Sequence, residues 1–283
     1  MALSCTPAKA VDYGMAKRPS CGPTGSGKPR RLSWCCGVDS PCPRAVLSCE
    51  RAATRQLSDD GLVRIKPGSV EAAAAVVVAA LRPGVGADWS VSAGDLQWSV
   101  DRTVAHMTGA PAKYAFYLSS RSTRYIAVRV WPDADATRQE RLEAIEGCAA
   151  ALAGVAATAP EDAVGFHVTG MRNAQQFLAM ACYELLIHAY DVTGGLELPY
   201  EPPEELCRLV IEHCYPGEDE QRPAWPFLVW LSGRCHPAAT GWGQPPIGGA
   251  IMFGDKLEDR SEIPLEFARD PATGEWRAIR WVA

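Results

Sequence analysis

Two side chains that could bind a metal ion lie one helical turn apart within an apolar stretch, residues 180–192. Glu184 and His188 are four positions apart, and because an α-helix has 3.6 residues per turn, both would lie on one face and could reach one ion. Burying a carboxylate or an imidazole without a partner is costly. Either the two side chains satisfy each other as an i,i+4 pair, or they are two ligands of a metal site. A third ligand elsewhere in the chain would favour the metal.

His106 is the candidate for that third ligand. It lies in a second apolar stretch, between Val104 and Gly109. A single histidine on an apolar helix is more often a hydrogen-bonded core residue, so His106 alone does not establish a site. Together with Glu184 and His188, it would supply two imidazoles and one carboxylate. That donor set suits zinc or a similar divalent ion and leaves positions open for water or a substrate.

Two further residues could assist such a site. Asp191 could accept a hydrogen bond from the imidazole of His188 and fix its tautomer, or it could face solvent near the end of the helix. Arg234 could bind a substrate carboxylate through two hydrogen bonds, although contacts with helix-end carbonyls explain it more simply. No residue is assigned a catalytic or cofactor-binding role. Three other histidines have no partner at ligand spacing and are interpreted as structural: His167, His213 and His236.

The composition predicts a globular protein whose partners are small molecules. Hydrophobic residues make up 47% of the 283 positions, which is enough for a sizeable core. The net charge of -5 does not favour a nucleic-acid-binding surface. The longest apolar run, residues 70–81, is too short to span a membrane. Because no apolar signal-peptide core follows Met1, we expect a cytoplasmic protein.

The first 62 residues differ in composition from the rest of the chain. They are rich in Pro, Gly, Ser, Arg and Cys and show no hydrophobic period, so we predict a disordered tail, which a wrongly placed start codon could have added. Residues 22–29 resemble a phosphate-binding loop, but Pro29 replaces the Ser or Thr that would hold magnesium, and no strand precedes Gly22. The cysteines of the tail lack the paired spacing of a structural zinc site. We therefore expect neither nucleotide nor zinc binding there.

Hydrophobic periodicity predicts four long helices that must position the three candidate ligands. Apolar residues recur at helical spacing in four segments: 69–81, 99–120, 136–158 and 172–192. Ser99 can cap the second helix, and Gly194-Gly195 suits the end of the fourth. Gly109 and Pro111 predict a kink or a break halfway along the second helix. Four such helices are typical of a four-helix bundle, in which metal sites are assembled from facing helices.

The remaining segments are shorter. Residues 125–131 predict a short extended segment and residues 165–170 a loop. Residues 202–214 predict a helix, and residues 263–282 alternate around a turn at 270–274, which makes a terminal hairpin plausible. The predicted organisation has three parts: a disordered tail at 1–62, a four-helix metal-binding bundle at 63–195, and a smaller α+β region at 196–283.

These motifs resemble those of a known family. The chain resembles the DinB-like bundle, and most closely its mycothiol-dependent maleylpyruvate isomerase type, in two motifs. The first is Trp98-Ser99-Val100 leading to Val104-Ala105-His106-Met107, and the second is the later Glu184-x-x-x-His188-Ala189-Tyr190-Asp191. The likeness covers roughly residues 65–235, and residues 225–234 look like the family's later helix ending in Gly-Arg. It implies that His106, Glu184 and His188 bind the metal ion. The last forty or so residues do not resemble the family clearly.

The resemblance also implies the chemistry. The metal ion would take a low-molecular-weight thiol such as mycothiol as thiolate, and that thiolate would attack a small electrophile. The outcome would be isomerisation of a cis-alkene diacid or transfer of the thiol to an alkylating electrophile, and the sequence does not choose between them. Two alternatives stay open: a metal-binding or stress-response protein without turnover, and a metal hydrolase that uses bound water. The sequence predicts no oligomeric state.

Overall fold

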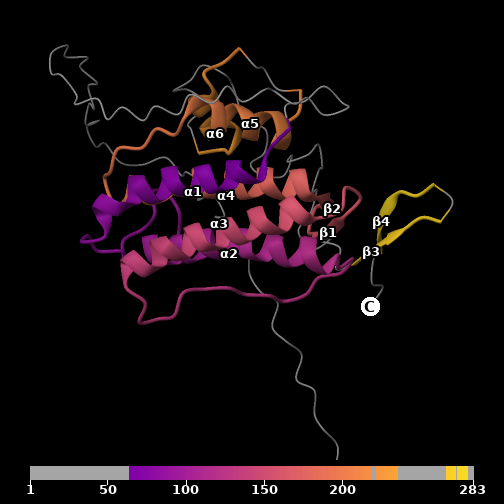
Figure 1. The fold of residues 1–283 in the computed structure, drawn as a ribbon. Helices are drawn as coiled ribbons and strands as arrows, with labels where there is room; N and C mark the ends of the chain where they lie inside the picture. The colour runs from indigo at the N-terminus through magenta and orange to yellow at the C-terminus, as the bar shows by residue number, and fades with distance from the viewer. Residues whose placement is uncertain (1–63, 218–220, 235–265, 272, 280–283) are drawn as a thin grey trace, which may run out of the picture. The chain divides into compact units, whose positions relative to one another are not determined.

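The structure is a computed structural model that describes residues 64–217, 221–234, 266–271 and 273–279 (Figure 1). The predicted tail at residues 1–62, with its loop-like motif and its cysteines, lies outside these residues, and so does His236. Among the described helices, none combines the length and the apolar character needed to cross a lipid bilayer.

The described part of the chain is mainly helical (Figure 1). Its elements are α1 (Pro67–Leu81), the short 3-10 helix η1 (Arg82–Gly84), α2 (Val100–Ser120), α3 (Arg138–Thr158), β1 (Val164–His167), β2 (Gly170–Asn173), α4 (Ala174–Gly195), α5 (Glu204–Cys214), α6 (Ala224–Leu231), β3 (Glu266–Arg269) and β4 (Trp276–Ile279). The four predicted long helices are confirmed as α1 to α4, with ends that differ by at most three residues. The helix predicted at 202–214 is confirmed as α5.

Side-chain caps explain why three of these helices begin where they do. Ser99 Oγ accepts a hydrogen bond from the backbone N–H of Arg102, at 3.2 Å, as predicted. Thr137 and Asn173 begin α3 and α4 with reciprocal capping, in which the side chain three residues later binds the backbone N–H of the capping residue. Each cap satisfies N–H groups that the first helical turn leaves without partners.

α2 continues as one helix through Gly109 and Pro111, so of the two predicted outcomes, a kink or a break, the break is wrong. A proline inside a helix costs about 3 kcal/mol. Twelve residues of α2 are buried, most of them against α3 and α4, and this burial outweighs the local cost. The absence of a side chain at Gly109 also has a use, because an added Cβ would lie 3.0 Å from the backbone oxygen of Val130. The glycine lets the segment after α2 pack closely on the helix.

Of the short segments, the predicted loop was wrong, and the predicted extended segment forms no sheet. Residues 165–170 are not a loop, because they contribute to an antiparallel hairpin in which Val164 pairs with Asn173 and His167 with Gly170. Residues 125–131 belong to none of the strands in the described part of the chain. A side chain, rather than a neighbouring strand, satisfies the backbone of this segment. The hydroxyl of Tyr117 accepts from the backbone N–H of Ile126 at 3.0 Å and donates to the backbone oxygen of Ile126 at 2.8 Å. The C-terminal hairpin, β3 paired with β4, is confirmed.

One hydrophobic core connects the helices. α2 packs on α3 and α4, α1 packs on the same two helices, and α5 packs on α4 and α6. The buried cluster extends from Ile65 to Leu231 and includes residues of all six α-helices. This packing places α2 beside α4, which brings the predicted ligands together from two distant parts of the sequence.

Glycines allow the loop before α2 to lie against the end of α4. A Cβ added to Gly195 would lie 2.2 Å from the backbone oxygen of Ser92, and one added to Gly94 would lie 3.3 Å from the backbone oxygen of Asp191. Gly94 also has a φ of 53°, a conformation that residues with a side chain rarely adopt. The loop that leads to Trp98 is therefore packed directly on the C-terminal turns of α4.

Candidate metal centre

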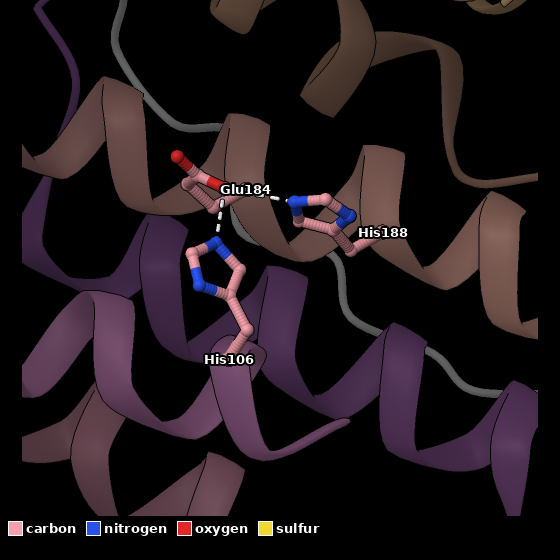
Figure 2. Close-up of side chains that lie close together, drawn as sticks. All are labelled: His106, Glu184 and His188. Carbon is pink, nitrogen blue, oxygen red and sulfur yellow. Dashed lines mark hydrogen bonds and ion pairs between the residues drawn. The ribbon is translucent and has the colours of Figure 1, made fainter. Parts of the chain in front are cut away.

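The three predicted ligands meet between α2 and α4 (Figure 2). His106 extends from α2 toward α4, where Glu184 and His188 lie one turn apart on the same face. Glu184 Oε2 lies 3.1 Å from His106 Nε2 and 3.2 Å from His188 Nε2. The structure therefore brings together the three residues that the sequence predicted, although His106 and Glu184 are 78 positions apart.

The spacing of the donor atoms suits a single small cation. One donor atom from each residue lies within 4.8 Å of the others. Zinc bonds of about 2.0–2.1 Å in a tetrahedron place neighbouring donor atoms roughly 3.3 Å apart, close to the 3.1 Å and 3.2 Å that separate Glu184 Oε2 from the two Nε2 atoms. The side chains of His106, Glu184 and His188 are 24%, 18% and 13% exposed, so an ion could reach the site from solvent.

The hydrogen bonds of His188 are the most informative feature of the site. Its Nδ1 lies 3.0 Å from Asp191 Oδ2, and its Nε2 lies 3.2 Å from Glu184 Oε2. A neutral imidazole carries a proton on one nitrogen only, and ionised carboxylates can only accept hydrogen bonds. Either His188 is an imidazolium, or Nδ1 donates to Asp191 while Nε2 and Glu184 share a cation. The second arrangement is the usual one for a metal-binding histidine.

The electrostatics of the three ligands favour charged Glu184 and neutral His106. Burial by itself raises the pKa of Glu184, but contacts with His106 and His188 outweigh it and hold that pKa well below the ordinary value. Burial lowers the pKa of His106, and the neighbouring Glu184 offsets this only in part. For His188, burial lowers the pKa, but the contacts with Asp191 and Glu184 raise it above the ordinary value. The contacts with both imidazoles therefore favour the carboxylate form of Glu184.

Outer contacts orient the ligands. Tyr114 on α2 donates a hydrogen bond of 3.4 Å to Glu184 Oε1, the oxygen that does not face the two imidazoles. Asp191 is only 5% exposed and binds His188 Nδ1, so the prediction that it orients this imidazole agrees with the structure, and the solvent-facing alternative is wrong. Both contacts involve the atoms that face away from the ion, so Glu184 Oε2 and His188 Nε2 remain available to bind it.

Arg234 has a partner that the sequence analysis missed. Its Nε donates to Asp191 Oδ1 and its Nη2 to Asp191 Oδ2, each at 2.8 Å. A weaker contact of 3.4 Å joins its Nη1 to the backbone oxygen of Ser232, so the simpler interpretation, a helix-end contact, is only part of its environment. Because the guanidinium is engaged with Asp191, the suggestion that it receives a substrate carboxylate has no support here.

Trp98 is a second neighbour of the site to which the sequence analysis gave no role. Its ring centroid lies 5.3 Å from that of His106, nearly edge-on, and 6.5 Å from that of His188, nearly parallel. The guanidinium of Arg102 lies 4.6 Å from the centroid of the same indole ring. The only signal in the sequence was the position of Trp98 in the motif that leads to His106, because no periodicity indicates a contact with α4.

Two of the three histidines interpreted as structural are hydrogen-bonded within short local segments. His213 Nδ1 bonds to the backbone oxygen of Leu209 at 2.9 Å, and His167 Nδ1 accepts from the backbone N–H of Thr169 at 3.3 Å. Neither belongs to a metal-capable cluster among the residues that the structure describes. His236 lies outside those residues.

Acid should destabilise the protein partly through His167. Burial, with the charges of Lys113 and Arg172, lowers the pKa of this imidazole to about 3 in the folded protein, against 6.5 for an ordinary histidine. As the pH falls, this histidine takes up a proton in the unfolded chain before it does so in the folded protein. The neutral, buried His167 therefore causes no loss of stability above pH 6.5, and the free energy of unfolding falls as the pH drops from 6.5 toward about 3. On acidification from roughly pH 7 to pH 5, we expect the free energy of unfolding to fall less for His167→Gln than for the wild type. Urea denaturation with a chelator present measures this, and equal losses would contradict it.

Comparison of the chain with protein-family models, curated proteins and solved structures finds no match. The geometry of this site and the sequence motifs are therefore the basis for inferring its function.

Proposed function

We propose that this protein binds one divalent metal ion, zinc or a similar ion, through His106, Glu184 and His188. The observation that carries the proposal is the position of His188 between two carboxylates, Asp191 on Nδ1 and Glu184 on Nε2. A cation at Nε2 explains this arrangement without a buried imidazolium. Three protein ligands leave at least one position of a tetrahedral ion open, which is the pattern of a catalytic rather than a structural zinc site.

We further propose that the chain is a DinB-like protein of the mycothiol-dependent maleylpyruvate isomerase type, acting as an isomerase or S-transferase on a small electrophile. The order of the motifs supports this, with Trp98 just before α2, His106 on α2 and E-x-x-x-H on the later α4. The packing of α1 to α4 on one another is also what such a bundle requires. When bound, the metal ion would hold the cofactor thiol as its thiolate, which is the nucleophilic form.

The chain's own residues have definable parts in this proposal. Glu184 would contribute the negative charge that balances the ion, and the hydroxyl of Tyr114 would hold its second oxygen away from the metal. His188 would keep its proton on Nδ1, toward Asp191. The half-buried ring of Trp98 would cover one side of both imidazoles and exclude water there. These contacts would leave the open coordination position to the thiol.

Mycothiol should raise the melting temperature of the metal-loaded protein and not that of the metal-free protein. A ligand at about 100 times its Kd stabilises a protein by about 2.7 kcal/mol, which is several degrees for a domain of this size. Thermal-shift measurements with zinc or with a chelator provide the test, and mycothiol with a methylated sulfur serves as the matched control. Stabilisation by zinc alone, with no effect of mycothiol, would contradict the thiol chemistry and favour a non-catalytic metal protein or a hydrolase.

A further inference from the structure

We infer that Arg234 is a positioning residue of the metal centre, which holds Asp191 so that His188 keeps its proton on Nδ1 and presents Nε2 to the ion. This inference rests on the proposed metal site and adds a third part of the chain to it, the segment after α6. The three groups form a continuous series of contacts from Arg234 to the metal-facing atom of His188.

The hydrogen bonds between Arg234 and Asp191 fix the carboxylate in orientation. Both carboxylate oxygens accept from the guanidinium at 2.8 Å, and one of them, Oδ2, also accepts from His188 Nδ1 at 3.0 Å. Two parallel bonds from a planar guanidinium define the plane of a carboxylate, which a single bond from a lysine does not. Because Asp191 cannot rotate freely, the imidazole that donates to it cannot rotate freely either.

The backbone at the end of α6 places Arg234 for this contact. The N–H of Gly233 bonds to the oxygen of Trp230 at 2.9 Å, and the N–H of Arg234 bonds to the oxygen of Val229 at 3.2 Å. This pair of bonds is a Schellman motif, in which a glycine with positive φ follows the helix, and Gly233 has a φ of 74°. The start of the Arg234 side chain is therefore fixed by main-chain bonds before the guanidinium reaches Asp191.

Burial indicates that this ion pair serves geometry rather than stability. The side chains of Asp191 and Arg234 are 5% and 21% exposed, so forming the pair removes much of the water around both charges. The cost of removing that water cancels much of the attraction between such charges, and a buried ion pair by itself is weak evidence for stabilisation. Its position directly behind His188 gives it a different use, because outer contacts of metal ligands tune metal affinity.

The test uses the full-length protein with Arg234→Lys, Arg234→Gln and Asp191→Asn. We expect each variant to bind zinc about 10- to 100-fold more weakly than the wild type, the effect typical of lost outer contacts. Arg234→Lys keeps the charge but should not restore affinity. The double variant Asp191→Asn/Arg234→Gln should be no weaker than Asp191→Asn alone, because Arg234 acts through Asp191. Affinity is measured by competition with a coloured chelator, and the visible spectrum of the cobalt-loaded protein reports the geometry at the ion.

Arg208→Gln is the matched control, since Arg208 also forms an ion pair, with Glu204, but does not contact Asp191. It should bind zinc as the wild type does. Wild-type affinity and an unchanged cobalt spectrum in Arg234→Lys would overturn the inference while the metal site stands. If the wild-type protein binds no divalent ion, the proposed function itself fails, so the two failures are distinguishable. Circular dichroism checks the fold of every variant. If Arg234→Gln does not fold, Arg234→Lys, which keeps the charge and a similar size, provides the test.

Discussion

Folded His106→Ala will contain as little metal as folded His188→Ala, although the two residues lie on different helices. Each places its Nε2 beside Glu184 Oε2 in the same group of donor atoms, so either replacement leaves only two protein ligands. Loss of a direct ligand should weaken binding beyond the about 10- to 100-fold typical of outer contacts. Elemental analysis after dialysis gives the metal stoichiometry, and circular dichroism shows that each variant is folded.

His213→Ala is the matched control for this experiment. His213 lies on α5 and bonds to the backbone oxygen of Leu209, so its removal should leave the metal content unchanged. Full occupancy in folded His106→Ala would end the three-ligand site. In that case Glu184 and His188 would be a buried pair that satisfy each other, and Glu184→Ala would chiefly cost stability, by roughly 1–3 kcal/mol for the partner left behind.

Gly195→Ala will destabilise the protein far more than Gly194→Ala. A Cβ at position 195 would lie 2.2 Å from the backbone oxygen of Ser92 and 3.1 Å from Cα of Ala93, so main chain would have to move. Overpacking of this kind costs about 1–3 kcal/mol, and the upper end applies where no flexible side chain can yield. At position 194 the nearest atom, Cα of Gly94, lies at 3.8 Å, which is an ordinary contact.

The adjacent glycine makes this comparison specific. Both residues belong to the last turn of α4, so any gain in helix propensity from alanine, up to about 1 kcal/mol, is similar for the two. We expect a loss of about 2–3 kcal/mol for Gly195→Ala and a change within about 1 kcal/mol for Gly194→Ala, measured by urea denaturation. Equal stability of the two variants would show that the loop at Ser92 is not held against α4. If the loop is displaced in Gly195→Ala as expected, metal affinity should also fall, because that loop carries Trp98.

Local features of the chain were predicted from the sequence because their causes are local. The periodicity of apolar residues predicted α1 to α4, and the hydroxyl of Ser99 predicted where α2 begins. The four-residue spacing of Glu184 and His188 placed both on one face of α4, and Asp191 follows within the next turn. The choice of His106 as third ligand needed the additional assumption that α2 and α4 face each other.

Tertiary packing decided what local spacing could not. The hairpin of β1 and β2 was missed because its strands have only four residues each, too few for a clear period. α2 remains unbroken at Pro111 because burial against neighbouring helices outweighs a local penalty. Arg234 lies 43 positions after Asp191, and the contact exists only because the turn after α6 brings its guanidinium to α4. The sequence by itself thus determined the helices and the candidate ligands, whereas packing between helices determined their orientation and their outer contacts.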